Sequence, residues 1–345
     1  MYRMEKYFWW NEKQKSLADE AAQFSDAVIA PRIREIERTK RFPWEFMSEI
    51  GKKGWFGILI PEAYGGMGED YGTTGMCIVL EEIARGVAVA VDFYETTIYG
   101  YSPIVRFDNV RVPRENLILN EGDGWRVMAD ALNIERLGVA AGAIGVARSS
   151  LAETSNYAGK RVQFGKTLSE IPAIQFMGSD MVTSIILGHT QTYYTACMLD
   201  SGRDVPIGAS VAKLYTTDTL MKTTLDAVQC HGGEGYTTQY PVERHMRDSK
   251  LIQIGAGSNE ILRTLIWKQW QKEVRAFEEA ERRSTTSAFR ILSTERRKSF
   301  DAEPVETVIG VRRSGQATEH SRFRPLWRDF PVRENSSRSE GSRPG

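Results

Sequence analysis

Hydrophobic residues along most of the 345-residue chain recur every three or four positions, the spacing of one face of an α-helix. Two short examples predict amphipathic helices near residues 17–28 and 76–83, and Pro31 is expected to interrupt or kink the first. Longer stretches of the same period, without internal proline, predict four more helices. The apolar positions of the short examples are Leu17, Ala21, Phe24 and Val28, then Met76, Val79, Leu80 and Ile83; the longer stretches are 123–157, 173–199, 207–230 and 258–276.

Strand character is nearly confined to residues 104–112, where a short apolar run with β-branched side chains leads into Pro113. One strand cannot make a sheet, so the predicted fold class is mainly α. The strand is either an irregular connector or a remnant of a domain whose other strands are absent.

Several short segments beside the predicted helices have ordinary structural interpretations. Residues 61–68 are typical of a turn between helices, and residues 161–166 of a helix end. Residues 229–236 are typical of a helix cap and turn, although their glycines also let a backbone approach a ligand closely. Residues 244–250 and 254–263 favour a turn followed by a helix start, where free N–H groups would favour an anion.

Composition is that of an ordinary globular protein, with 41% hydrophobic residues, 26% charged residues, and 45 Lys and Arg against 45 Asp and Glu. Without a basic surplus there is no electrostatic case for nucleic acid or an anionic membrane. No apolar run could span a bilayer, and charges occupy the place where a signal peptide needs an apolar stretch, so we predict a cytoplasmic protein. Three separated cysteines and four histidines predict neither a disulfide framework nor a metal site.

The last part of the chain differs in composition from the rest. Residues 280–345 hold 14 Lys and Arg against 9 Asp and Glu, whereas residues 1–279 hold 31 against 36. All but one of those 14 basic residues are arginine, and Ser, Thr, Pro and Gly are frequent, so the segment cannot bury enough apolar surface to fold. We predict a disordered tail of extraneous or frame-shifted origin; an arginine-rich arm that binds nucleic acid is the alternative.

Several motifs, taken together and in order, carry a resemblance that none of them carries alone. They are PEAYGGMG (61–68), FDNVRVPRENL (107–117), NIERL (133–137), RVQFGK (161–166), QCHGGEGY (229–236) and RDSKLIQIGAGSNEILR (247–263). In this order the chain resembles the acyl-CoA dehydrogenase family over residues 1–276.

The resemblance implies helical domains with only a remnant of the family's middle β-domain. The implied parts are an incomplete N-terminal helical domain in 1–100, the β-domain remnant in 101–120 and a C-terminal four-helix domain in 121–276. The disordered tail predicted from composition follows in 277–345. It also implies a flavoprotein oxidoreductase of fatty acid metabolism, a homo-oligomer (tetramer or dimer) that uses FAD. Such an enzyme oxidises an acyl-CoA to the 2-enoyl-CoA and passes electrons to an electron-transfer flavoprotein.

A carboxylate base must remove the α-proton of a thioester while hydrogen-bond donors hold the carbonyl oxygen of the developing enolate. Many family members carry that base at the position of Ala256, which has no acid to offer. A subgroup typified by isovaleryl-CoA dehydrogenase carries it on the long helix, where Asn-Ile-Glu-Arg-Leu of this chain matches. The resemblance therefore assigns the base to Glu135 and an enolate donor to the Ala256 N–H. The acyl-CoA site that it implies consists of Asn133, Ile134, Arg136, Ala256 and Gly257.

Nine positions match the family's flavin-binding residues, and some of them are expected to reach a flavin in a neighbouring subunit. The residues expected to reach across are Arg161 and the segment 229–233. One position departs from the pattern, because Pro172 stands where the family usually has a flavin-contacting glutamine. The implied FAD-binding set is Arg161, Gln229, Cys230, His231, Gly232, Gly233, Ser258, Asn259 and Glu260.

The chain departs from the family in one large respect. Only six residues separate Gly100 from the strand at Phe107, where the family has the rest of its N-terminal domain and nearly all of its β-domain. Roughly a hundred residues, the size of a small domain, are therefore missing. Three hypotheses follow: a working flavin dehydrogenase, a non-catalytic helical fragment that keeps the oligomerisation surfaces, or an acyl-CoA reductase that uses the same residues.

Overall fold

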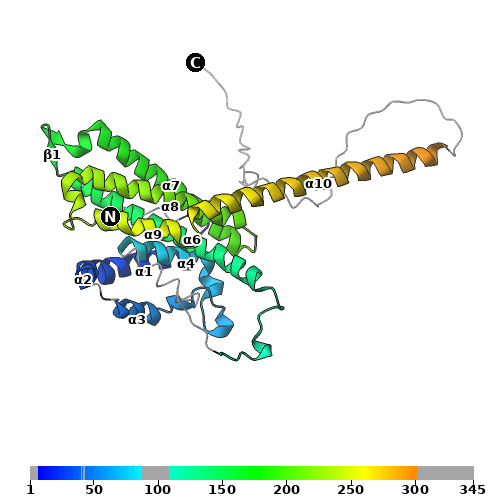
Figure 1. Ribbon diagram of the computed structural model, residues 1–345, viewed down its shortest axis with the longest axis horizontal. Helices are drawn as coiled ribbons and strands as arrows, with labels where there is room; N and C mark the ends of the chain where they lie inside the picture. Colours follow the sequence, from blue (N-terminus) through cyan, green and yellow to red (C-terminus); the bar gives the residue numbers. More distant parts are fainter. Residues whose placement is uncertain (1–6, 40, 42, 87–108, 301–345) are drawn as a thin grey trace, which may run out of the picture. The chain divides into compact units, whose positions relative to one another are not determined.

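The computed structural model describes residues 7–39, 41, 43–86 and 109–300, with the backbone alone at residue 281 and residues 284–300 (Figure 1). The chain divides into two units, Met1–Trp270 and Gln271–Gly345, each described by itself below. The first unit is built almost entirely of helices, which confirms the mainly α fold. None of the described helices is both long and apolar enough to cross a membrane.

The described residues between 7 and 86 form helices joined by short turns (blue to cyan in Figure 1). The first predicted helix forms, with Leu17, Ala21 and Phe24 buried and its first turn capped by Asn11. Pro31 lies in a 3₁₀ turn that follows a π-turn, so the helix is interrupted there as predicted. The elements are α1 (Glu12–Phe24), a π-turn (Ser25–Ile29), α2 (Ile33–Thr39), α3 (Trp44–Lys52), α4 (Gly68–Gly86), and 3₁₀ turns at Ala30–Arg32, Trp55–Gly57 and Glu62–Tyr64.

Helix α4 bends at Gly72, and a carboxylate distant in sequence caps the part that follows. Gly72 has φ 55° and ψ −157°, outside the helical region. Asp200 accepts hydrogen bonds from the Thr73 N–H at 2.7 Å and from the Thr74 N–H and hydroxyl at 2.9 and 2.6 Å. A Cβ at Gly72 would lie 2.7 Å from the Asp200 carboxylate, so only glycine fits. This cap joins the N-terminal helices to the bundle described next.

Three long helices form the body of the remaining part of the first unit: α6 (Gly124–Ala158), α7 (Pro172–Asp200) and α8 (Pro206–His231) (Figure 1). Each packs on the other two, and α9 (Val242–Ile254) packs on α6 and α8. Helix α6 also packs on α4 at Gly145, where a Cβ would lie 2.1 Å from a carbonyl oxygen of α4. The three long helices confirm the predicted ones, with their ends shifted by a single residue.

Two segments differ from the prediction. Residues 161–166, expected to be a helix end, contain most of a hairpin in which β1 (Val162–Gln163) pairs antiparallel with β2 (Lys166–Thr167). Its turn residues Phe164 and Gly165 have φ of 55° and 79°, the left-handed geometry that two-residue hairpin turns need. Residues 244–250, expected to form a turn, belong to helix α9. The sequence pattern did not indicate this helix, because its buried face is mostly polar and shows no apolar period. The buried polar residues are Arg244, His245, Asp248 and Ser249.

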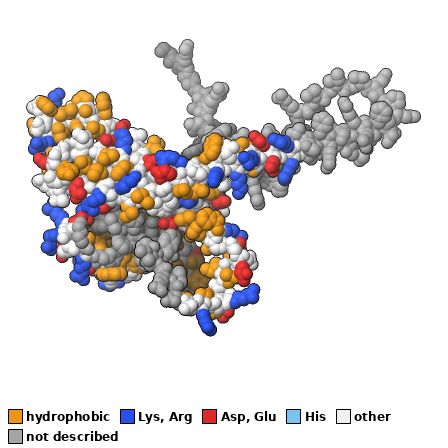
Figure 2. Space-filling view, in the orientation of Figure 1, with side chains coloured by type: hydrophobic (Ala, Val, Ile, Leu, Met, Phe, Trp, Pro, Cys, Tyr) orange, Lys and Arg blue, Asp and Glu red, His pale blue; other side chains and the backbone are white. Residues whose placement is uncertain are grey.

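Exposed apolar side chains gather at the end of the bundle that carries the hairpin. Figure 2 shows hydrophobic side chains concentrated at this end. Phe164 at the hairpin tip is 91% exposed, and Phe176 near the start of α7 is 69% exposed. Further along α7, Val182, Ile186 and Leu187 are also exposed. This apolar face has no partner within the described chain.

The strand predicted at residues 104–112 is absent from its described part. Residues 109–112 form no strand, and Val110 and Val112 are 60% and 67% exposed. Neither of the described strands pairs with them, and their β-branched side chains stay largely exposed. A 3₁₀ turn (Arg114–Asn116) follows. Residues 104–108, and the short connection after Gly100, lie outside the described residues.

The last helix, α10 (Asn259–Phe300), crosses from the first unit into the second. It runs past residue 276, so the disorder expected from 277 does not hold for residues 277–300. The sequence from 259 to 300 contains neither glycine nor proline. Glu278 pairs with Arg282 and Glu279 with Arg283, both at 3.8 Å and at the helix-stabilising i, i+4 spacing. Residues 301–345 lie outside the described residues, where the disorder stays a prediction.

Charged side chains that a sequence pattern would place at the surface lie buried between α4, α6 and α7. Arg148 Nη1 lies 2.6 Å from Glu81 and 2.8 Å from Glu82, and the Tyr193 hydroxyl donates to Glu81 at 2.8 Å. They line a cavity of about 40 Å³. Burial of these charges is tolerated because each is paired.

Candidate functional site

The loop between α9 and α10 holds two residues of the predicted acyl-CoA site. Ala256 and Gly257 have φ of 53° and 90°, and this left-handed geometry is unusual for alanine. Ala256 is half-buried and packs against the main core. Its backbone N–H donates to no residue of the described chain.

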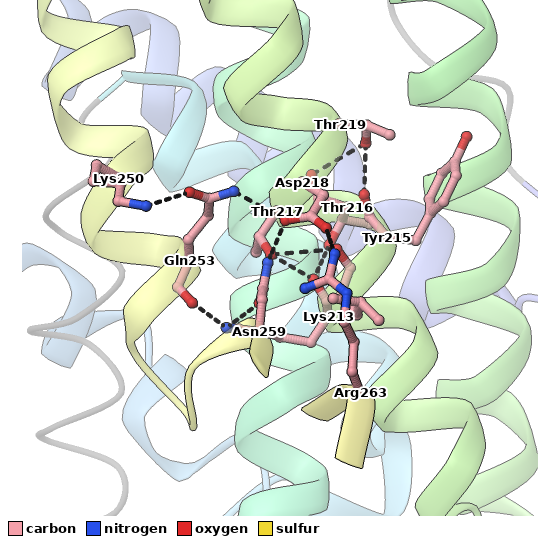
Figure 3. Close-up of polar contacts among 11 residues, drawn as sticks. Lys213, Tyr215, Thr216, Thr217, Asp218, Thr219, Lys250, Gln253, Asn259 and Arg263 are labelled. Carbon is pink, nitrogen blue, oxygen red and sulfur yellow. Dashed lines mark hydrogen bonds and ion pairs between the residues drawn. The ribbon is translucent and has the colours of Figure 1, made fainter. Parts of the chain in front are cut away.

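A buried lysine of α8 anchors both ends of this loop (Figure 3). Lys213 Nζ donates to the carbonyl oxygens of Gln253 and Gly257 at 3.0 Å each, and to Asn259 Oδ1 at 2.8 Å. The side chain is fully buried, and burial lowers the pKa of Lys213 to about 8. No sequence motif singled out Lys213.

Asn259, predicted to contact a flavin, is buried and uses its amide within the protein (Figure 3). Its Nδ2 donates to Thr217 Oγ1 at 2.9 Å and to Asp218 Oδ1 at 2.6 Å, while its Oδ1 accepts from Lys213. Asp218 also pairs with Arg263 of α10. Asn259 therefore fixes the start of α10 to α8 and has no amide group left for a ligand.

The two neighbours of Asn259 in the predicted set are nearer to solvent. Glu260 is exposed, and Ser258 is half-buried. Hydrogen bonds from its own backbone N–H and from the Ser258 side chain lower the pKa of Glu260. The first turn of α10 thus carries a carboxylate that its own helix start stabilises.

Helix α6 brings Glu135 and Arg136 to the same stretch of α8. Arg136 is 7% exposed, and its Nη1 donates to Asn133 Oδ1 at 3.2 Å and to Ser210 Oγ of α8 at 3.5 Å. Its Nε–H has no partner in the described chain, and burial lowers the pKa of Arg136. Glu135 is half-buried, and its charge acts on both Arg136 and Lys213. Ile134, beside Glu135, packs against the core.

The structure therefore brings together most of the predicted acyl-CoA site. The α6 segment contacts α8 at Ser210, and the 255–258 loop is tied to α8 at Lys213, one turn further along. A carboxylate consequently shares one region with a guanidinium N–H and a backbone N–H that have no partner in the part of the chain that the structure describes. This combination can remove a proton and stabilise the negative charge that results.

The other predicted flavin residues lie at the far end of α8. Arg161 pairs with Glu234 at 3.5 Å, and Gln229 is exposed. His231 is buried, stacks on Tyr157 with ring centroids 4.2 Å apart, and donates from Nδ1 to the Ala227 carbonyl oxygen at 2.8 Å. The His231 Nε2 has no partner in the described chain. Cys230 is buried beside Met177.

These residues could contact one end of a dinucleotide, but they do not form a complete binding site for it. A Cβ at Gly232 or Gly233 would meet nothing within 4 Å, so a ligand could approach the backbone there. From Thr217, which binds Asn259, to His231 the helix rises about 20 Å. The two groups of predicted flavin residues therefore lie at opposite ends of this stretch of α8. The described residues also hold no cluster of three His, Cys, Asp or Glu side chains suited to a metal.

Comparison with known families finds two matches. The family described as acyl-CoA dehydrogenase, N-terminal domain, matches residues 11–110, and the one described as acyl-CoA dehydrogenase, C-terminal domain, matches residues 122–270.

Two curated relatives and one solved structure are similar to the chain. An acyl-CoA dehydrogenase of Bacillus subtilis (strain 168) is 38% identical over 201 residues, 58% of this chain and 53% of the relative. A short-chain-specific acyl-CoA dehydrogenase of Megasphaera elsdenii is 41% identical over 155 residues, 45% of this chain and 40% of the relative. The chain thus spans about half, or less, of these relatives. The butyryl-CoA dehydrogenase structure from Megasphaera elsdenii superimposes with a TM-score of 0.68 at 23% identity, over 78% of this chain and 100% of that one, and shows a shared fold.

Proposed function

The chain belongs to the acyl-CoA dehydrogenase family, and from that premise we propose that it acts on acyl-CoA thioesters by dehydrogenating them to 2-enoyl-CoA. One observation carries the proposal: α6 and the 255–258 loop meet on the same stretch of α8. Glu135 shares this region with the Arg136 Nε–H and the Ala256 N–H, neither of which has a partner among the described residues. Those are the groups that α-proton removal from a thioester needs.

Each residue of this region has a proposed role. The Glu135 carboxylate takes the α-proton, and the Ala256 N–H donates to the thioester oxygen as enolate charge develops. Asn133 holds the Arg136 guanidinium beside them, while Ile134 and Gly257 line the site. FAD, held through Arg161, Gln229, Gly232 and Gly233, would accept the β-hydride when bound. An electron-transfer flavoprotein is the proposed electron acceptor.

We propose that the working form is a homo-oligomer, a tetramer or a dimer. The resemblance implies that Arg161 and the segment 229–233 reach the flavin of a neighbouring subunit, and these residues lie about 20 Å along α8 from the start of α10. The exposed side chains of α7 that include Phe176, Ile186 and Leu187 form an apolar face, and a second copy that packed on this face would bury it. The cytoplasmic location stays a prediction from the sequence.

Two other candidate functions use the same site. A non-catalytic helical fragment is favoured by the short connection between Gly100 and Phe107, which leaves no room for the family's β-domain. An acyl-CoA reductase would need the same residues and differ in direction.

Reduction of an artificial electron acceptor by acyl-CoA, with FAD added in excess, tests the proposal. We expect dye reduction that requires both acyl-CoA and FAD, because the proposed proton-removing groups share one region. Acyl-CoA binding without dye reduction would favour the non-catalytic fragment. Oxidation of a reduced dye by enoyl-CoA, without the forward reaction, would favour the reductase.

A further inference from the structure

Lys213 is the most completely buried cation of the bundle, and its surroundings explain why a charge is kept there. Its side chain is 0% exposed. An ammonium group has three N–H donors, and each has an acceptor at 2.8 to 3.0 Å. Removing such a group would leave buried acceptors unpaired, which is strongly unfavourable.

The three acceptors flank Ala256 in sequence. Gln253 lies in the last turn of α9, Gly257 follows Ala256, and Asn259 begins α10. Ala256 adopts a left-handed conformation that is unfavourable for a residue other than glycine, and such a conformation persists only where its surroundings fix it. The three hydrogen bonds from Lys213 provide that constraint on both sides.

We propose that Lys213 is a positioning residue of the acyl-CoA site: it ties the 253–259 segment to α8 and so holds the Ala256 N–H toward the thioester carbonyl. This inference rests on the proposed function. Lys213 is electrostatically coupled to the other proposed groups, since the charges of Glu135, Arg136 and Glu260 all act on it. It acts through the loop, without touching the thioester.

The test compares Lys213→Met with Lys222→Met, which removes an exposed lysine of the same helix. Lys222 pairs at the surface with Asp180 and Asp226. Two probes are used: acetoacetyl-CoA, whose acidic α-carbon lets it bind as an enolate, and S-butyl-CoA, a thioether that lacks the thioester carbonyl oxygen. Hydrogen exchange of the residue 254–258 amides, followed by mass spectrometry, reports the loop without any ligand.

In Lys213→Met we expect the loop amides to exchange about tenfold faster or more, and acetoacetyl-CoA to bind about tenfold more weakly, as for the loss of one well-placed hydrogen bond. Binding of S-butyl-CoA should change less than about twofold, because that probe does not use the Ala256 N–H. The Lys222→Met protein should match the wild type in all three measurements. Should Lys213→Met fail to fold, Asn259→Ala removes one of the three acceptors, together with the hydrogen bonds to Thr217 and Asp218, and should give the same pattern.

The outcomes separate this inference from the proposed function. Unchanged loop exchange, or equal weakening of both probes in Lys213→Met, would overturn the positioning role while the proposed function stands. A wild-type chain that binds neither probe would overturn the proposed function, and the positioning role with it.

Discussion

The 345-residue chain, purified without added flavin, should be colourless, and it should bind FAD about three powers of ten more weakly than a relative that has a complete β-domain. The family resemblance implies a flavin ring held between the β-domain and the C-terminal helices. In this chain the described strands amount to one two-stranded hairpin. Only six residues stand where the β-domain would be.

The expected size of the loss follows from the area left in water. One face of a flavin ring, like a large aromatic side chain, covers on the order of 150 Å². At about 25 cal/mol for each Å², leaving that face wet forfeits about 4 kcal/mol, or nearly three powers of ten in Kd. The ring's hydrogen-bond partners on the missing wall would add to this.

The ratio of flavin to protein absorbance, followed by titration with FAD, measures this prediction. The Bacillus subtilis acyl-CoA dehydrogenase, treated in the same way, is the control. Stoichiometric flavin in the chain as purified would contradict the prediction, and would mean that the helices or a second copy provide the missing wall.

Replacing Glu135 with glutamine should lower dye reduction by a factor of about a hundred to ten thousand, the usual contribution of a general base. The amide keeps the shape of the side chain but cannot accept the α-proton. Acyl-CoA affinity should stay within a few-fold of the wild type, because Arg136 and the 255–258 loop remain. The assay uses saturating FAD, so weak flavin binding does not limit the rate.

Asp130→Asn is the matched control, because Asp130 is an exposed carboxylate of the same helix. It should keep wild-type activity. Full activity in Glu135→Gln would remove Glu135 as the base. Position 256, where many family members carry the base, is alanine and offers no alternative carboxylate.

The long helices could be predicted because their buried faces are apolar and periodic. Met76, Val79 and Ile83 in α4 are fully buried as predicted. The hairpin could not be predicted, because the left-handed turn at Phe164 leaves no trace in a hydrophobic pattern. Helix α9 was missed because its buried face carries Arg244, His245 and other polar groups.

Sequence analysis also missed the buried charged residues of the site and the core. Lys213 follows Ala209 by four residues and precedes Leu220 by seven, and both of these are buried, so helical spacing places Lys213 on the inner face of α8. That spacing is the signal that could have found it. Arg148 and Glu81 lie on different helices, and only the packing of α4 on α6 brings them together.

The family resemblance identified the predicted acyl-CoA residues, and the structure adds the contacts with α8 that connect them. Glu135 and Ala256 are far apart in sequence, and the shared contact with α8 could not be derived from either motif. Asn259 shows why a role assigned from the family to one residue at a time can fail. It matches a flavin-binding position, yet its amide is fully hydrogen-bonded to Lys213, Thr217 and Asp218.

Exchange of the α-proton of an acyl-CoA with solvent deuterium, catalysed by the chain without flavin, tests the central claim most directly. Proton removal needs the base and the enolate donors but no hydride acceptor, so the measurement is independent of the FAD prediction. Mass spectrometry should show deuterium at the α-carbon, at a rate well above that of a protein-free control, and the Glu135→Gln chain should lose this exchange. An acyl-CoA that saturates the chain and gains no deuterium, or equal exchange in Glu135→Gln, would contradict the account.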